Sequence, residues 1–110
     1  MPPGIRIHRW DEIALEKVTE MISRKIVSGE REMLAQIYLK RGALVPMHAH
    51  ESEQMTYILQ GALRFLIEGE VLHIPSGMPH QAEALEDTLE LDVFSPIRAE
   101  WIDSAEGSDL

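Results

Sequence analysis

Histidine is the residue type in this 110-residue sequence that is best suited to hold a metal ion. His48 and His50 are two positions apart, so on an extended strand their rings point to the same side. Gln54 lies four residues further on, an even offset that keeps it on that side. His80 follows the turn 75–79, whose two prolines restrict the backbone. Three imidazoles and one amide oxygen that converge would bind one divalent metal ion, and zinc, nickel, manganese, iron and copper all accept such ligands.

The segments that carry these side chains are short and are separated by glycine and proline. The breaks come about every 8–12 residues, a spacing that is typical of an all-β sandwich or barrel. The expected strands are 32–39, 54–60, 62–67, 71–74 and 88–94. The last of these alternates, with Leu89, Leu91 and Val93 on one face and Thr88, Glu90, Asp92 and Phe94 on the other. The sequence therefore predicts a small all-β domain.

Residues 15–27 are compatible with two different elements. Their apolar residues are mostly three or four positions apart, which favours an amphipathic helix that Asp11 would cap and Gly29 would end. The alternative is a strand over 19–27 that is followed by a hairpin turn at Ser28 and Gly29. The residues that set this spacing are Leu15, Val18, Met21, Ile22 and Ile26.

Charge and composition exclude several classes of partner. Ten basic residues face nineteen acidic ones, so the formal net charge is −9 and we expect no nucleic-acid partner. The absence of cysteine excludes disulfides, cysteine-ligated zinc and thiol nucleophiles. No apolar stretch approaches the ~20 residues that span a bilayer, and the first residues lack the apolar core of a signal peptide. We therefore expect no membrane association and a cytoplasmic location.

The length allows one hydrophobic core and hence one domain. We expect residues 1–17 to form an N-terminal segment and residues 18–102 to form the domain itself. Residues 103–110 are small and acidic, which predicts a disordered tail.

The spacing of the glycines and histidines resembles the two motifs of the cupin family. The first motif corresponds to Gly42, His48, His50, Gln54 and Gly61, and the second to Gly69, Pro75, Gly77 and His80. The resemblance implies a small β-barrel, or conical jelly roll, with a metal in its mouth held by His48, His50, Gln54 and His80. It also favours a strand for the ambiguous segment. Only seven residues separate Gly61 from Gly69, so the hairpin between the motifs is shorter than is usual in cupins.

Gln54 stands where cupins usually have a glutamate ligand. A neutral amide compensates less of the charge of a metal ion, which would make that ion a stronger Lewis acid. It also departs from the two-histidine, one-carboxylate set of iron oxygenases.

A narrower resemblance links the chain to the pectin-degradation cupins. It rests on the histidine and glutamine pattern together with the segment 92–98, which contains Asp92, Phe94 and Arg98. It implies a metal-dependent enzyme that converts 4,5-unsaturated uronates from pectin or alginate breakdown to open-chain keto acids. Asp92 would then be the general acid or base, Arg98 would bind the substrate carboxylate, and Phe94 would pack against the sugar ring.

Other interpretations of the same residues stay open. Asp92 could be a hydrogen-bonded structural carboxylate, Phe94 a core residue, and Arg98 a partner in a surface ion pair. The whole chain could be another metal cupin, such as a dioxygenase or a sugar isomerase, or a non-catalytic protein that binds a metal or a sugar. If Asp92 points inward, Leu89, Leu91 and Val93 point outward and need cover, which predicts a homodimer.

Overall fold

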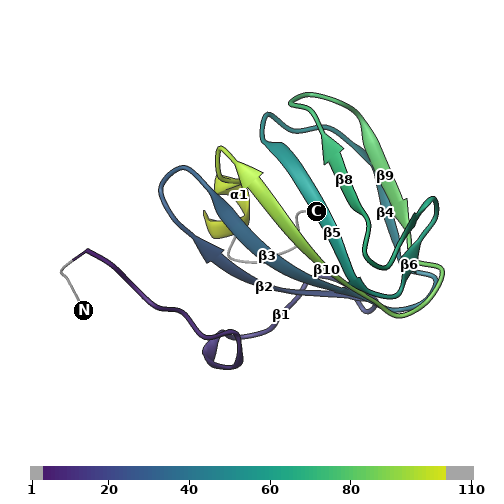
Figure 1. Cartoon of the computed structure of the whole chain (residues 1–110), viewed down its shortest axis with the longest axis horizontal. Helices are drawn as coiled ribbons and strands as arrows, with labels where there is room; N and C mark the ends of the chain where they lie inside the picture. Colours follow the sequence, from purple (N-terminus) through teal and green to yellow (C-terminus); the bar gives the residue numbers. More distant parts are fainter. Residues whose placement is uncertain (1–3, 104–110) are drawn as a thin grey trace.

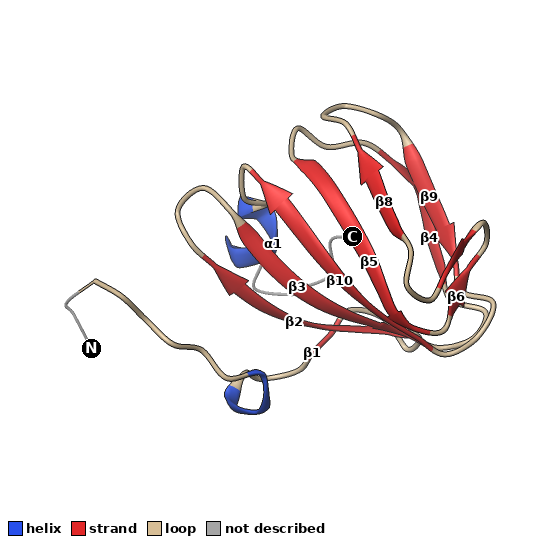
Figure 2. Ribbon diagram, in the orientation of Figure 1, coloured by secondary structure: helices blue, strands red, loops and turns tan. Residues whose placement is uncertain are grey.

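The computed structural model describes residues 4–103, and these residues form an almost entirely β structure (Figure 2). This confirms the predicted all-β class. The strands are β1 (Glu16–Lys17), β2 (Ile22–Ser28), β3 (Met33–Leu39), β4 (Leu44–His48), β5 (Glu53–Gln60), β6 (Ala62–Leu63), β7 (Leu66–Ile67), β8 (Val71–Ile74), β9 (His80–Glu83) and β10 (Thr88–Ser95). The described helical elements are the 3-10 turn η1 (Trp10–Glu12) and the short helix α1 (Ala99–Asp103). No helix among these residues is long and apolar enough to cross a membrane.

Six of the strands form one antiparallel sheet in the order β1-β2-β3-β10-β5-β8. The strands β4 and β9 pair with each other, as do β6 and β7. In Figure 1, β4 and β9 lie at the opposite side of the molecule from the N-terminal segment. The two motifs that carry the histidines therefore meet through the pairing of β4 with β9, in which His48 is opposite His80.

Residues 15–27 hold β1 and most of β2 with a turn over 18–21 between them, so the helix favoured by their apolar spacing is wrong. The alternative strand over 19–27 is confirmed in type, but β2 begins at Ile22 and includes Ser28. Strand β2 pairs with β3 along its whole length, and the N–H of Gly29 donates to the carbonyl of Glu32 at 2.9 Å to close the hairpin. The alternation of β2 is hidden in the sequence because one of its inward residues is charged. Arg24 is completely buried, donates to Glu16 at 2.8 Å and stacks on the ring of Trp101.

The inward faces of the strands form one hydrophobic core. Its fully buried members include Ile22, Met33, Ala35, Ile58 and Phe94. Strand β10 alternates as expected, since Asp92 and Phe94 are buried whereas Val93 is exposed on the outer face. A carboxyl group is thus placed inside the barrel beside an aromatic ring.

The short link between Gly61 and Gly69 holds β6 and β7, which pair with each other as the expected shortened hairpin. The single strand expected over 62–67 is therefore wrong, because a turn at residues 64–65 divides it. Gly61 has a positive φ of 95° and packs so closely that a Cβ there would lie 2.3 Å from the carbonyl oxygen of Asp87. Gly69 also has a positive φ, of 88°, but nothing lies within 4 Å of the corresponding position.

The ends of the expected domain differ in how far the structure describes them. Strand β1 joins the edge of the large sheet from within the segment 1–17. Asp103 ends α1, and the rest of the expected acidic tail lies outside the described residues.

Candidate functional site

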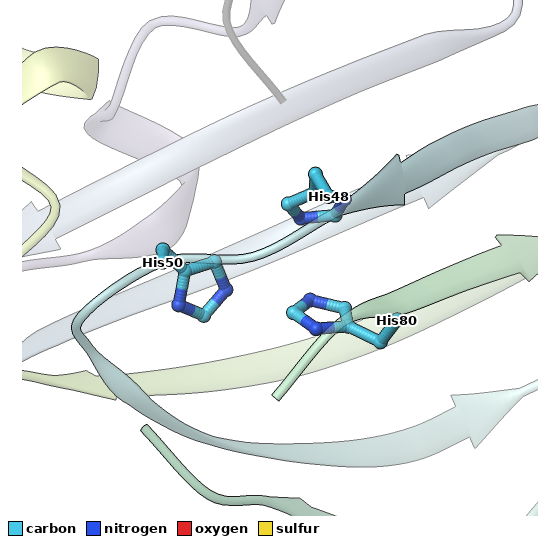
Figure 3. A group of neighbouring side chains, drawn as sticks. All are labelled: His48, His50 and His80. Carbon is cyan, nitrogen blue, oxygen red and sulfur yellow. The ribbon is translucent and has the colours of Figure 1, made fainter. Parts of the chain in front are cut away.

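Three histidine rings converge at the end of the β4–β9 pair (Figure 3). His48 is the last residue of β4, and His50 lies two residues further on, beyond the end of that strand. His80 is the first residue of β9. The ring centroids are 4.3 Å apart for His48 and His80, 4.9 Å for His50 and His80, and 5.5 Å for His48 and His50. One nitrogen from each ring lies within 4.8 Å of the others, a cluster that could hold a metal ion.

Each ring is oriented by a hydrogen bond to a backbone carbonyl two residues away. Because a carbonyl can only accept, Nδ1 of each ring carries the proton and the neutral ring keeps a lone pair on Nε2. His80 Nε2 is buried without a hydrogen-bond partner in the described structure, as expected of a nitrogen directed at a cation. The three bonds run from His48 to Pro46 (2.9 Å), from His50 to Ser52 (2.8 Å) and from His80 to Met78 (2.8 Å).

Gln54 supplies a fourth donor atom to this cluster. Its Oε1 lies 3.0 Å from His50 Nε2, and both atoms carry lone pairs because His50 already donates from Nδ1. Two such atoms repel each other unless a cation lies between them. With ligand distances of roughly 2.0–2.2 Å, neighbouring ligands of one ion are about 3 Å apart, so the donor set fits a divalent metal.

The electrostatic surroundings of His48 and His50 favour the neutral form of these two imidazoles. Burial is the largest cause that lowers the pKa of His48 and of His50 below the ordinary value, and the positive charge of Arg98 adds to it. Neutral imidazole is the form that binds metals, so the site disfavours the proton as a competitor.

A buried carboxyl pair lies behind the histidines, on the inward face of β10. The hydroxyl of Thr56 donates to Asp92 Oδ1 at 2.7 Å, and Glu90 is also hydrogen-bonded to Asp92. Burial raises the pKa of both carboxyls, that of Glu90 well above its ordinary value. Two adjacent buried carboxyls cannot both ionise at low cost, so the pair retains a proton that Glu90 holds in preference to Asp92.

Glu90 was not among the residues expected at the site. Its even offset from Asp92 places both on one face, and this was the available signal. A glutamate in an alternating strand is usually exposed to solvent, which made the signal easy to overlook.

Arg98 lies beside the aromatic residues at the same end of the barrel. Its side chain is 7% exposed, and its Nε donates to Glu100 at 2.9 Å. The guanidinium is 4.4 Å from the ring centroid of Trp101 and 5.6 Å from that of Phe94. Phe94 is almost fully buried and meets the ring of His50 edge-on at 5.8 Å, so it is a core residue that also borders the histidines.

A single cavity brings most of these groups together. His8 is exposed, and His73 lies on the outer face, where it pairs with Glu53, so neither contributes to it. Most of the remaining lining is apolar, which strengthens electrostatic interactions inside. The polar and aromatic residues that line it are His48, Gln54, Thr56, Arg64, His80, Gln81, Glu90, Asp92, Phe94, Arg98 and Trp101.

The fold, the paired motifs and the histidine cluster define a cupin. The cupin domain family matches residues 36–95, which include all three histidines and the carboxyl pair. The chain therefore belongs to the cupin family.

Similar proteins include two that carry the same name. The chain is 27% identical over 103 residues to the pectin degradation protein KdgF of Dickeya dadantii (strain 3937), a match that covers 84% of this chain and 94% of that protein. The solved structure of KdgF from Halomonas sp. is 35% identical, with a TM-score of 0.74, and the match covers 82% of this chain and 94% of that one. An RmlC-like cupin from Shewanella frigidimarina superposes with a TM-score of 0.80 at 20% identity over 89% of this chain and 96% of that one, which shows a shared fold.

Proposed function

We propose that this cupin is a metal-dependent enzyme that opens and ketonises 4,5-unsaturated uronate monosaccharides from pectin or alginate breakdown. The observation that carries the proposal is the arrangement of three Nε2 atoms and the Gln54 oxygen beside a buried acid, Asp92, and a nearby cation, Arg98. The similarity to KdgF proteins, whose name refers to pectin degradation, supports the sugar class.

The residues of the chain fit the proton movements of this isomerisation. The ring opens when the anomeric hydroxyl loses its proton and the bond from C1 to the ring oxygen breaks. The enol that results becomes a ketone when C4 gains a proton, so substrate and product are isomers. Asp92 can accept and return a proton because burial raises its pKa above the ordinary value of 3.8, and hydrogen bonds from Thr56 and Glu90 hold it in place.

Binding of the anionic uronate would depend on two positive groups in an otherwise acidic protein, the divalent ion and Arg98. His48, His50, His80 and Gln54 would hold the divalent ion, whose chemistry when bound is to polarise the sugar oxygens as a Lewis acid. Arg98 presents a planar guanidinium that suits the uronate carboxylate. The rings of Phe94 and Trp101 pack against that guanidinium, which limits its rotation.

The first test concerns the metal site. We expect purified protein to bind about one equivalent of a divalent metal, and His48→Ala to lose most of it, because removal of one of three imidazoles breaks the cluster. His73→Ala is the matched control, since His73 is outside the cavity and should leave metal content unchanged. Equal metal content in the His48→Ala variant and the wild type, by elemental analysis, would contradict the ligand set.

The second test concerns the reaction. Metal-loaded protein should accelerate the loss of ultraviolet absorbance from the conjugated double bond of a 4,5-unsaturated galacturonate, and Asp92→Asn should lower the rate by about 10²–10⁴-fold. Oxygen uptake by the iron-loaded protein would indicate a dioxygenase instead. Tight sugar binding without turnover, unchanged in Asp92→Asn, would indicate a non-catalytic sugar-binding cupin.

A further inference from the structure

Thr56 connects the amide of Gln54 to the carboxyl of Asp92. It lies on β5, opposite Asp92 in the register of β5 and β10, and is buried with its side chain inside the barrel. Its Oγ1 donates to Asp92 Oδ1 at 2.7 Å and accepts from Gln54 Nε2 at 2.8 Å. The hydroxyl has a single proton, and that proton is used on Asp92, so Thr56 can offer only a lone pair to Gln54.

This direction of hydrogen bonding selects one of the two orientations of the Gln54 amide. A lone pair on Thr56 attracts the NH₂ group, and the carbonyl oxygen is then turned towards His50 Nε2, 3.0 Å away. The reversed amide would direct N–H groups, which cannot bind a cation, at the histidines. It would also require the Thr56 proton for the amide oxygen, and Asp92 would lose a hydrogen bond inside a buried cavity.

We infer that Thr56 is a positioning residue that makes Gln54 an oxygen ligand, an inference that rests on the metal site of the proposed function. Within residues 4–103, the hydrogen bonds of the Thr56 side chain go to Gln54 and Asp92 and not to a histidine, so its effect on the metal passes through Gln54. The requirement exists because residue 54 is an amide. A carboxylate presents an oxygen in either orientation and needs no such selection.

Metal affinity provides a readout that does not depend on activity. We would titrate the metal-free protein with Zn²⁺ in competition with a chromogenic chelator, for the wild type, Thr56→Val and Thr56→Ser. Valine preserves the shape and the strand preference of threonine but removes the hydroxyl. We expect Thr56→Val to raise the Kd for Zn²⁺ about 10–100-fold, as is common for residues that orient ligands, and Thr56→Ser to stay within about threefold of the wild type.

The Gln54→Glu background separates an orienting role from a packing role. If Thr56 acts by selecting the amide orientation, Thr56→Val should weaken Zn²⁺ binding much less in Gln54→Glu than in the wild type. An equal loss in both backgrounds would overturn the inference, because it would indicate a general packing defect. A Thr56→Val protein with wild-type affinity would overturn it as well.

Two further measurements keep these outcomes interpretable. If Thr56→Val does not fold, as judged by circular dichroism, Thr56→Ala carries the same prediction in both backgrounds. In Co²⁺-loaded protein, the visible absorption spectrum should change in the hydroxyl-free variant and return in Thr56→Ser. A wild-type protein that fails to bind Zn²⁺ would overturn the metal site and the proposed function, whereas normal wild-type binding with an unaffected Thr56 variant would overturn the role of Thr56 alone.

Discussion

Glu90 and Asp92 are two neighbouring carboxyl groups with different surroundings inside one barrel. Asp92 accepts from Thr56 and is close enough to Arg98 for that positive charge to oppose the rise in its pKa, whereas burial and the neighbouring Asp92 both raise the pKa of Glu90. Glu90 is therefore the carboxyl group that more strongly favours the neutral form, and Asp92 is the one that loses its proton more easily. Different environments for paired carboxyls are a common way to divide such roles.

This difference predicts how the stability of the metal-free protein depends on pH. The folded-state pKa of Glu90 is raised above its ordinary value of 4.5, so its contribution to stability is complete below that pH and is lost as the pH rises through the folded-state pKa. Glu90→Gln cannot ionise and keeps a donor towards Asp92. We expect its Tm to fall less than that of the wild type as the pH rises from 5 to 8.

Glu68→Gln is a suitable control for this measurement, because Glu68 is exposed to solvent and should follow the wild type. Parallel Tm curves for Glu90→Gln and the wild type would contradict a neutral Glu90. His48 and His50 have the opposite sign, since their lowered pKa values add stability above the ordinary value of 6.5 that is lost on acidification. Because the wild type and Glu90→Gln both contain these histidines, the histidine contribution cancels when their two Tm curves are compared.

At the scale of single residues, the sequence predicted which side chains would meet at the site but not which hydrogen bonds would orient them. The even offset from His50 to Gln54 placed both on one side, and the structure has them 3.0 Å apart. The Nδ1 contacts to Pro46, Ser52 and Met78 depend on local backbone conformation, which residue types do not specify. Whether the gathered residues bind a metal and a uronate stays a prediction.

Among the elements, β2 shows why sequence periodicity was insufficient. Ile22 and Ile26 face inward with Arg24 between them, so a charged residue occupies a position that alternation would give to an apolar one. Arg24 is accommodated because Glu16 and the indole of Trp101 meet its guanidinium. These partners lie on β1 and α1, and their approach is a tertiary event that the local pattern could not reveal.

The glycines of the short hairpin predict a difference between two similar substitutions. Gly61→Ala places a methyl group 2.3 Å from a backbone oxygen in addition to the positive φ, so it should cost well over the 1–2 kcal/mol of a left-handed non-glycine residue. Gly69→Ala meets open space and should cost about 1–2 kcal/mol. Denaturant unfolding of both variants measures the difference, and equal losses would be inconsistent with the close packing at Gly61.

At the scale of the whole molecule, the outer face of the large sheet carries a group of exposed apolar side chains. Val93, Met55 and Tyr57 are exposed there, and the register places Val93 beside Met55 and Leu91 beside Tyr57. Leu34 is opposite Val93 on the neighbouring strand β3 and extends the same apolar area. Uncharged area on an otherwise acidic surface is suited to a second copy of the chain, because like charges elsewhere would repel.

We therefore propose that a homodimer forms through this face. Val93→Glu should convert the dimer to a monomer, since a stable interface of about 800 Å² per partner does not accommodate an unpaired buried charge. Leu44→Glu is the matched control, because Leu44 is exposed on β4 and outside the large sheet. Light scattering after size-exclusion chromatography distinguishes the two states, and a monomeric wild type at micromolar concentration would refute the proposal.

The carbonyl contacts of the three imidazoles have a consequence for the identity of the ion. Each ring is oriented by a backbone carbonyl two residues away along the chain. Local structure therefore arranges the three rings before any ion binds. A prearranged set of neutral nitrogens and one oxygen has little means of rejecting one first-row transition metal in favour of another. We therefore expect the metal supply of the cell to decide which cation the site binds, and we expect that cation to exchange without unfolding of the chain.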